Sequence, residues 1–215
     1  MDVTGPTVEN EPVAALEVIA AQVRVCPKCE LCRSRTHAVP GEGNPKARVM
    51  LIGEGPGFYE DREGRPFIGN SGKFLSSLLA KAGLEREDVF ITNVVKCRPP
   101  GNRDPLPDEI AACAPYLDGQ IAVIDPDVIV TLGRFSMARW FAGERISKIH
   151  GQAKRDGRRV IVPMYHPAAA LHQSSLRGAI EEDFERLPKI LAEMEQRRQS
   201  DAARDAPQAE QSRLF

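Results

Sequence analysis

Five cysteines offer the clearest chemistry in this chain of 215 residues. Cys26 and Cys29 are separated by two residues, and Cys97 and Cys113 by fifteen, so Cys32 is surplus to two pairs. A metal centre held by thiolates needs four ligands, and two pairs brought together by the fold supply them. The spacing alone leaves three interpretations open: an iron–sulfur cluster, a structural zinc site, or unrelated buried thiols that act as small hydrophobes.

Three polar side chains of different chemistry lie where predicted strands end. Glu54 and His166 closely follow apolar runs at 47–53 and 158–164, and Asn93 lies near the end of another run. The carboxyl ends of parallel strands meet at one edge of a sheet, where ligands bind, so we expect the three side chains to share a rim. A carboxylate, an amide and an imidazole together suit an enzyme that handles developing charge on its substrate.

A glycine-rich turn, Gly53-Glu54-Gly55-Pro56-Gly57, lies at the end of the first run. Glycines there allow backbone N–H groups to approach a ligand. The turn lacks the spacing and the lysine of phosphate-binding loops, and the nearby acids Glu60 and Asp61 would repel a phosphate. The alternative is a plain strand-to-helix turn. Phe67 adds an aromatic ring on a neighbouring loop, where a role in the core or in a lid competes with substrate contact.

The elements that position these residues alternate between apolar runs and amphipathic segments. Strands are predicted at 47–53, 89–94, 127–133 and 158–164. Helices are predicted from Val13 to Val23 behind a cap at Asn10, from Asn70 to Ala82, from Pro107 to about Ile124, at 134–142, and from about Gly178 to Arg198. Alternating β and α units indicate a parallel sheet with helices on both faces.

Composition and charge limit the class of protein. Apolar residues make up 42% of the chain, enough to bury a core, and 29 Lys and Arg against 30 Asp and Glu exclude a generally basic protein. One domain is predicted at 12–198, between disordered segments at 1–11 and 199–215. Without an apolar run of about 18 residues or a signal segment, the chain is predicted to be soluble and cytoplasmic, with no membrane contact. The odd cysteine count there disfavours disulfides.

Nucleic-acid binding by a chain of net charge −1 requires a local basic patch. The segment from Arg134 to Arg159 supplies one, because it holds eight basic side chains and two acidic ones. Such a patch suits contacts to phosphates, which position a protein without reading sequence. The alternative is an ordinary solvated surface.

Five motifs follow one another along the chain: GEGNP at 41–45, GEGPG at 53–57 with an acidic pair at 60–61, GRPFIGNSGK at 64–73, ITNVVKCRPPGNRDPLPDE at 91–109 and HPAAAL at 166–171. In order and separation they resemble the motifs of the family 4 uracil-DNA glycosylases, the iron–sulfur branch of the uracil-DNA glycosylase superfamily. The resemblance spans about Cys26 to Leu191. It implies a three-layer αβα sandwich with a four-stranded parallel sheet.

The resemblance also implies an activity. Such enzymes flip deoxyuridine out of DNA and hydrolyse its N-glycosidic bond, which releases uracil and leaves an abasic site for DNA repair. Asn93 matches the amide that pairs with the uracil edge, and His166 matches the histidine that hydrogen-bonds the departing uracil anion. Glu54 matches the acid beside C1′, which orients water or stabilises the sugar cation. The alternative, a non-catalytic iron–sulfur DNA-binding or redox protein, would have no need of all three side chains.

Further residues match the substrate pocket and the cofactor site. Phe67 matches the ring on which the base stacks, and Glu60 matches a carboxylate near the base's C5 that helps to reject the thymine methyl group. The remaining pocket positions are Gly53, Gly55, Pro56 and Asn102. The family's four ligands of a [4Fe–4S] cluster fall on Cys26, Cys29, Cys97 and Cys113, which leaves Cys32 without a role. By resemblance, the metal is therefore iron rather than zinc.

Two departures concern the chemistry. In the best-known uracil-DNA glycosylases an aspartate general base follows the position of Glu54, whereas this chain has Gly55, so the group that activates water is open. A related branch that becomes cross-linked to DNA carries a long basic insertion with a nucleophilic histidine. The connection from Cys97 to Pro105 is short and holds no histidine, so hydrolysis is expected instead.

The final residues, Gln211-Ser212-Arg213-Leu214-Phe215, end on two large apolar side chains after a polar stretch. This Q-x-x-L-F pattern resembles the short peptides by which bacterial repair and replication proteins bind the sliding clamp, with Gln211, Leu214 and Phe215 as the contacts. Chance occurrence and packing onto the enzyme's own surface are the alternatives. The enzyme is otherwise expected to act as a monomer on uracil-containing DNA.

Overall fold

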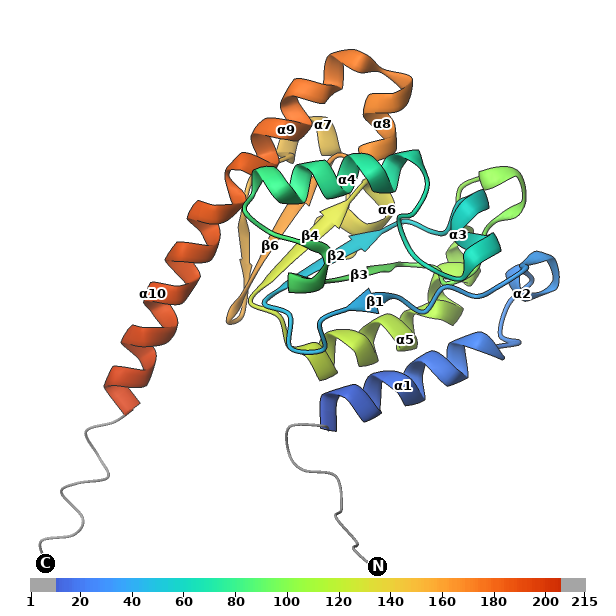
Figure 1. The fold of residues 1–215 in the computed structure, drawn as a ribbon, viewed down its shortest axis with the longest axis horizontal. Helices are drawn as coiled ribbons and strands as arrows, with labels where there is room; N and C mark the ends of the chain where they lie inside the picture. Colours follow the sequence, from blue (N-terminus) through green and yellow to red (C-terminus); the bar gives the residue numbers. More distant parts are fainter. Residues whose placement is uncertain (1–10, 206–215) are drawn as a thin grey trace, which may run out of the picture.

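A six-stranded sheet forms the centre of the computed structural model, which describes residues 11–205. The strand order is β1-β3-β2-β4-β6-β5 (Figure 1). The four central strands run parallel and coincide with the four predicted ones: β3 (Val89–Asn93), β2 (Val49–Gly53), β4 (Val128–Leu132) and β6 (Arg159–Met164). The predicted α/β fold with a parallel sheet is therefore confirmed.

Two short edge strands correct the predicted strand count from four to six. The strand β1 (Glu42–Gly43) pairs antiparallel with β3, and β5 (Lys154–Asp156) pairs antiparallel with β6. They consist of two and three residues, and every residue of β5 is exposed. Such short, polar strands carry no hydrophobic period, so the sequence pattern does not reveal them.

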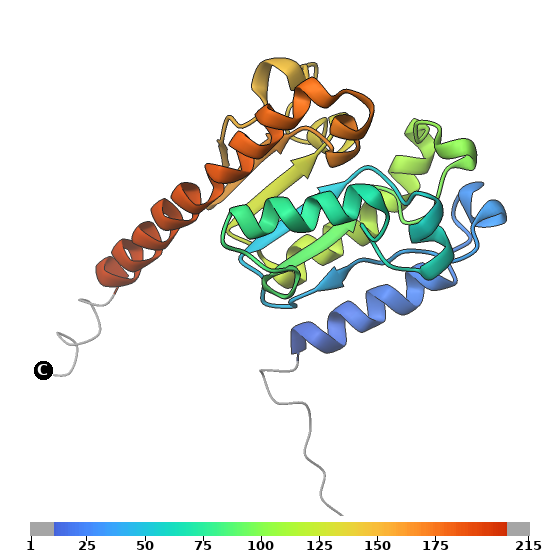
Figure 2. The ribbon, with the colours of Figure 1, turned by 45° about the horizontal axis from the view of Figure 1, so that its top comes forward.

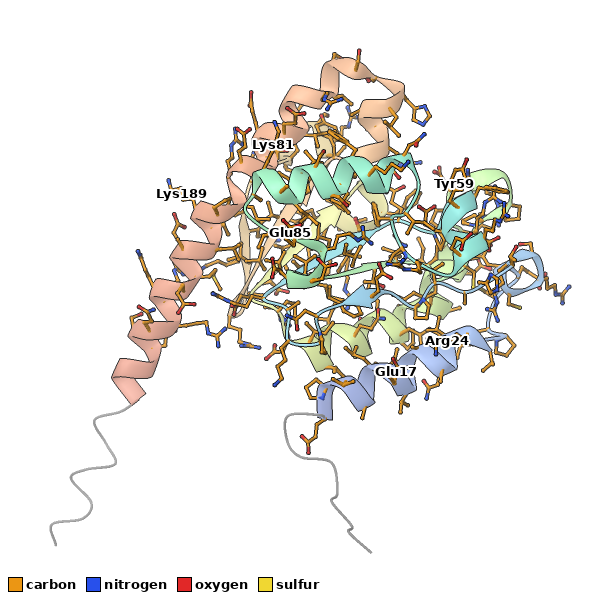
Figure 3. All side chains as sticks on the ribbon, in the orientation of Figure 1. Glu17, Arg24, Tyr59, Lys81, Glu85 and Lys189 are labelled. Carbon is orange, nitrogen blue, oxygen red and sulfur yellow. The ribbon has the colours of Figure 1, made fainter. Side chains whose placement is uncertain are left out.

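Helices cover both faces of the sheet, as an αβα sandwich requires (Figures 1 and 2). One face packs against α4 (Asn70–Lys81) and α9 (Arg177–Glu185), and the other against α1 (Glu11–Arg24) and α5 (Pro107–Ile124). All five residues of β2 are buried, and their side chains alternate between the two faces. Glu17 and Lys189 are exposed and point to solvent (Figure 3).

Short helical turns make up most of the connections. They are α2 (Leu31–Ser34), α3 (Phe58–Glu63), η1 (Arg86–Asp88), η2 (Pro100–Asn102), α6 (Arg134–Met137), α7 (Ile146–Ile149), α8 (Pro167–His172) and η3 (Ser174–Leu176). No helix among residues 11–205 is both long enough and apolar enough to span a membrane.

Two predicted helices differ from the observed ones. The helix expected at 134–142 ends at Met137, and the chain continues in a turn where the Met137 carbonyl accepts from the N–H groups of both Trp140 and Phe141. The helix expected from about Gly178 to Arg198 is divided into α9 and α10 (Leu187–Asp205). Pro188 explains the division, since it has no N–H to continue the hydrogen bonds of α9.

The last helix, α10, also continues through residues 199–205, for which the composition predicts disorder. Gln199 supports this turn by donating from its side chain to Glu195 Oε1 at 3.1 Å. Its far end projects away from the sheet (Figures 1 and 2). Arg198 ties α10 to the domain through an ion pair with Asp127, which lies immediately before β4.

Candidate active site

The register of the central strands brings their carboxyl ends to one edge. Gly53 at the end of β2 pairs with Asn93 at the end of β3, and Leu132 of β4 pairs with Met164 of β6. A cavity of about 560 Å³ opens at this edge, within the range typical of small-molecule sites. Nearly all of the pocket residues expected from the sequence line it: Glu54, Gly55, Pro56, Glu60, Phe67, Asn93, Asn102 and His166.

Asn93 lies on the floor of this cavity and is 1% exposed. Within residues 11–205, its side-chain oxygen Oδ1 has no hydrogen-bond partner. Leaving a buried acceptor unpaired costs free energy, so the amide is arranged for a partner that arrives with a ligand. Behind it, Lys96 Nζ donates to the Asn93 main-chain oxygen at 2.8 Å and to Gln120 Oε1 at 2.7 Å, which fixes the end of β3.

Gly53 does not line the cavity but supports two residues that do. A methyl group at this position would overlap Asn93 Oδ1 and lie 2.7 Å from Cζ of the Phe67 ring. Both contacts are closer than side-chain atoms tolerate. Glycine is therefore the residue that lets the amide and the aromatic ring approach each other over the end of β2.

His166 stands at the start of α8, where its ring nitrogen Nδ1 accepts a hydrogen bond from the Ala168 N–H at 3.1 Å. With Nδ1 an acceptor, a neutral imidazole carries its proton on Nε2. Burial lowers the pKa of His166 to about 4, and the nearby charge of Glu60 only partly opposes this shift. At neutral pH, His166 is therefore an uncharged N–H donor at the cavity wall.

Glu54 lies across the cavity edge, against the start of α6. Its Oε1 accepts a hydrogen bond from the Phe135 N–H at 3.3 Å. Burial raises the pKa of the Glu54 carboxyl, while the amide of Phe135 and the charge of Arg134 oppose that increase. Gly133, with φ of 96°, leaves the room that the carboxylate occupies. A carboxyl group in a cavity with a pKa raised by burial is a candidate for proton exchange with a ligand.

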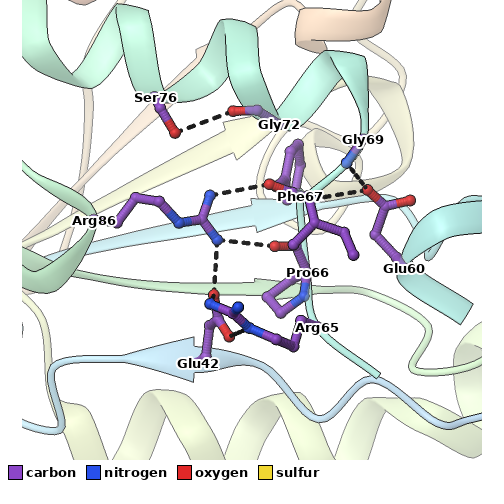
Figure 4. Close-up of polar contacts among 10 residues, drawn as sticks. Glu42, Glu60, Arg65, Pro66, Phe67, Gly69, Gly72, Ser76 and Arg86 are labelled. Atoms are coloured by element: carbon purple, nitrogen blue, oxygen red, sulfur yellow. Dashed lines mark hydrogen bonds and ion pairs between the residues drawn. The ribbon is translucent and has the colours of Figure 1, made fainter. Parts of the chain in front are cut away.

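The loop that carries Phe67 is held from both sides (Figure 4). Arg86 donates to the Phe67 oxygen at 3.0 Å and to the Pro66 oxygen at 2.9 Å, and Glu42 holds the guanidinium at 2.8 Å. On the other side, Glu60 Oε1 accepts from the N–H groups of residues 68 and 69 at 3.0 and 2.9 Å. Phe67 has φ of 52°, which a non-glycine residue adopts only when its surroundings impose it.

These contacts give Phe67 and Glu60 double roles. The Phe67 ring is 5% exposed, belongs to the core and also lines the cavity, where it stacks on His166 with ring centroids 5.3 Å apart. The Glu60 carboxylate is buried and bonded to the loop backbone, so it shapes the cavity besides lining it. Asn102, by contrast, lies at the exposed mouth, where its Oδ1 accepts from Arg98 Nε at 2.7 Å.

The five cysteines form a second cluster, on the α1 and α5 side of the domain. Cys26 follows α1, Cys29 precedes α2, Cys97 follows β3 and Cys113 lies within α5; these four and Cys32 line one small cavity. All five thiols are free. Among residues 11–205, no group of three or more His, Cys, Asp or Glu side chains is close enough to hold a single metal ion.

One cation and one backbone N–H point at these sulfur atoms. Arg35 Nη1 donates to Cys97 Sγ at 3.2 Å, and the Lys96 N–H donates to Cys113 Sγ at 3.3 Å. Burial raises the pKa of Cys97 to about 11 and also raises the pKa of Cys113. A buried set of thiols with cationic and N–H donors aimed at sulfur fits a centre in which the sulfurs carry negative charge.

Sequence reasoning misses the residues that support the cavity and the cysteine cluster. Arg86 and Glu42 hold the Phe67 loop, Lys96 holds Asn93, and Arg35 contacts a thiol. Most of their partners are remote in the chain, and Glu42 and Arg86 are 44 positions apart, whereas Lys96 and Asn93 are three apart. The one sequence feature that pointed to a supporting residue was Lys96, a charged residue directly after the apolar pair that follows β3.

The expected basic patch is divided by the fold. Arg158 and Arg159 both pair with Asp125 at the amino end of β6, roughly 17 Å of strand away from the cavity edge. The strand β6 crosses the sheet and separates these two arginines from the cavity edge. They therefore do not contact a ligand bound in the cavity. Arg134 does lie at the cavity, where it pairs with the lining residue Asp104.

Fold and site together define a class of protein: an αβα fold whose sheet-edge cavity is lined by a buried amide, a neutral imidazole and a carboxylate. Comparison with known proteins agrees, since residues 40–192 match the family described as the uracil DNA glycosylase superfamily. The chain belongs to this superfamily and, within it, to the type-4 uracil-DNA glycosylases.

Relatives of two types support that placement. A type-4 uracil-DNA glycosylase of Sulfurisphaera tokodaii is 53% identical over 186 residues, with 82% of this chain and 84% of that protein covered. The type-4 enzyme of Thermotoga maritima is 44% identical over 181 residues, with 82% and 94% covered. A type-5 uracil-DNA glycosylase of Thermus thermophilus is 39% identical over 114 residues, with only 46% and 52% covered.

Proposed function

We propose that the cavity receives a deoxyuridine flipped out of DNA and that Glu54, Asn93 and His166 carry the hydrolysis of its N-glycosidic bond. The observation that carries this proposal is the unpaired, buried Oδ1 of Asn93 on the cavity floor, within the described part of the chain. Uracil presents an N3–H donor beside an O4 acceptor, and the Asn93 amide offers the matching acceptor and donor. Cytosine has an acceptor and a donor at these places, so the same amide rejects it.

Charge separates when the bond between C1′ and N1 breaks. The electron pair leaves with uracil, and the His166 Nε2–H donates to the oxygen of the departing anion. Because the pKa of His166 is about 4, the group is a neutral donor and does not transfer its proton to the base. The Glu54 carboxylate faces the cation that develops on the sugar. We propose that Glu54 accepts the proton of the water whose oxygen adds to C1′, since Gly55 offers no side chain for that role.

Phe67 and Glu60 complete the pocket. The Phe67 ring supplies an apolar face for stacking, and its loop is rigidly held, which limits the movement of the bound base. Glu60 lies beside the ring and keeps its carboxylate fixed by two backbone N–H groups. We propose that this wall contacts the C5 position, where the methyl group of thymine would meet a charged and immobile neighbour.

The Glu54 role is tested by the pH dependence of uracil release. The carboxylate is the active form and its pKa is raised, so the release rate is expected to fall as pH decreases through a value above the ordinary glutamate range. Glu54→Gln is expected to abolish this acidic limb and lower the plateau by about 10²-fold or more. Single-turnover rates on a single-stranded oligonucleotide with one deoxyuridine, with deoxycytidine as the substrate control, measure both. An unchanged acidic limb in Glu54→Gln would assign the water to another group.

We also propose that Cys26, Cys29, Cys97 and Cys113 hold a [4Fe–4S] cluster. A single zinc ion needs its sulfurs within about 2.3 Å of one point, whereas each iron of a four-iron cluster takes one thiolate and so separates them. The gathering of the four thiols around one small cavity, with the Arg35 guanidinium and the Lys96 backbone N–H directed at sulfur, supports the proposal. When bound, the cluster supplies a cross-link between α1, β3 and α5.

Replacing any of these four cysteines with alanine is expected to remove the brown colour of the protein and lower its melting temperature by roughly 10 °C or more. Each kcal/mol is worth about 2–4 °C in a domain of this size, and metal cross-links contribute several kcal/mol. Iron analysis, absorbance and thermal unfolding of anaerobically purified protein provide the measurement. Cys32→Ala is the matched control and should keep colour and stability. Stoichiometric zinc without iron would overturn the assignment.

The remaining proposals concern binding partners, oligomeric state and cellular location. Cytoplasmic location and a monomeric state are consistent with the domain but rest on the sequence. Sliding-clamp binding through Gln211, Leu214 and Phe215 also rests on the sequence, because these residues lie outside the described residues. Among the basic residues of the 134–159 segment, we propose Arg134 as a phosphate contact, since it is the one paired with a cavity residue.

A further inference from the structure

Two adjacent aromatic side chains on α3 are exposed to solvent. Phe58 is 51% exposed and Tyr59 is 57% exposed, and they meet edge to face with ring centroids 5.4 Å apart. Single exposed apolar residues are common on protein surfaces, but a pair of large rings held in contact is a typical feature of binding surfaces. The function described above does not use either ring.

The pair lies at the rim of the substrate cavity. Gly57 and Glu60, on either side of it in the sequence, both line the cavity. Tyr59 also approaches the loop that carries Phe67, since its Cδ2 would be 3.3 Å from a Cβ at Gly69. Figure 3 shows Tyr59 on α3, at the outer surface of the domain. A DNA strand that places one base in the cavity therefore has its neighbouring bases close to these rings.

A cation accompanies the rings. The Arg98 guanidinium lies over Phe58, 5.2 Å from the ring centroid, and its Nε donates to Asn102 Oδ1 at 2.7 Å. Asn102 lines the cavity mouth, so Phe58, Arg98 and Asn102 form one continuous surface that ends at the cavity. Aromatic rings beside a cation are the elements with which proteins bind single-stranded nucleic acid, because every base offers a face for stacking and every nucleotide a phosphate.

We propose that Phe58 and Tyr59 form a stacking platform for the base next to the flipped deoxyuridine in single-stranded DNA, with Arg98 contacting the adjoining phosphate. The inference rests on the proposed function of the cavity. Its occupant is a nucleotide rather than a protein partner, because the rings, the cation and the cavity are contiguous. A base in a duplex remains paired and stacked on its neighbours, so the platform favours single strands.

The test combines a protein variant with a changed substrate. Phe58→Leu/Tyr59→Leu keeps apolar, helix-compatible side chains and removes both rings. Stacking of one base is commonly worth about 5- to 150-fold in affinity. The double variant is therefore expected to raise the dissociation constant for a single-stranded oligonucleotide with an uncleavable 2′-fluorodeoxyuridine by about tenfold. Fluorescence anisotropy measures the binding, and Val18→Ala, an equally exposed apolar position on α1, is the control that should bind like wild type.

Oligonucleotides that lack the base on the 5′ or the 3′ side of the deoxyuridine complete the cycle. Removing the stacked base is expected to weaken wild-type binding by about the same factor and to leave the double variant unaffected. Equal binding of wild type and double variant to the intact strand would overturn the platform. A separate uracil-release assay of wild type tests the cavity. Absence of uracil release would contradict the proposed function. The comparison of DNA binding by wild type and double variant would still show whether the two rings bind a base.

Discussion

Replacing His166 with alanine is expected to slow single-turnover uracil release by about 10²–10³-fold, the usual effect of removing one donor to a developing anion. The donor is the Nε2–H of a neutral imidazole, because Nδ1 accepts from the Ala168 N–H and burial holds the pKa of His166 near 4. The loss should therefore be nearly constant between about pH 6 and pH 8, where the imidazole does not titrate.

Single-turnover release at saturating enzyme measures this effect, and anisotropy with an uncleavable analogue checks that DNA binding is largely retained. His37→Ala is a suitable control, since His37 contacts the Asp61 backbone and does not line the cavity. A His166→Ala variant with wild-type rates would exclude this imidazole from the reaction. A wild-type rate that rises on acidification through pH 6 would contradict the neutral form.

Asn93→Asp is expected to reduce uracil release by about 10³-fold or more, because a site built to hydrogen-bond its substrate strongly rejects one that leaves a buried partner unpaired. The substitution replaces the donor that faces uracil O4 with a carboxyl oxygen. At 1% exposure the new carboxyl cannot be hydrated, so burial and repulsion act together. Cytosine, whose N4 group is a donor, loses less from the change than uracil does.

The measurement is the ratio of release rates from matched oligonucleotides with one deoxyuridine or one labelled deoxycytidine. That ratio should fall sharply in Asn93→Asp. Asn44→Asp changes the same atoms on a surface loop, where Asn44 Oδ1 accepts from the Lys46 N–H, and should leave the ratio as in wild type. An unaltered ratio in Asn93→Asp would mean that another group reads the base.

Local pattern was sufficient for the central sheet and the rim of the site. Buried parallel strands are short apolar runs, so their ends, and hence the positions of Glu54, Asn93 and His166, follow from the sequence. Sequence also separated the cysteines from the residues of the cavity. Edge strands β1 and β5 carry no such pattern, and the end of the helix at Met137 depends on how the following turn packs.

Contacts between distant segments could not be predicted in the same way. The Glu42–Arg86 pair and the Lys96–Gln120 bond join positions that come together only after the sheet has formed. Counting charges along the 134–159 segment could not show which of them lie near the cavity, since Arg158 and Arg159 lie at the opposite edge of the sheet and Arg134 pairs with a cavity residue. Phe67 required its backbone conformation to be known before its two roles could be distinguished.

The direction of α10 has a practical consequence for how the enzyme is handled and held. Arg198 of α10 pairs with Asp127 at the amino edge of the sheet, and Arg48 pairs with both Asp127 and Glu195 of α10. Asp205 ends the helix still farther from the carboxyl edge (Figure 1). A surface linker or fluorescent reporter joined behind α10 would leave the cavity mouth unobstructed. An enzyme immobilised by that end would present its cavity mouth to the solution.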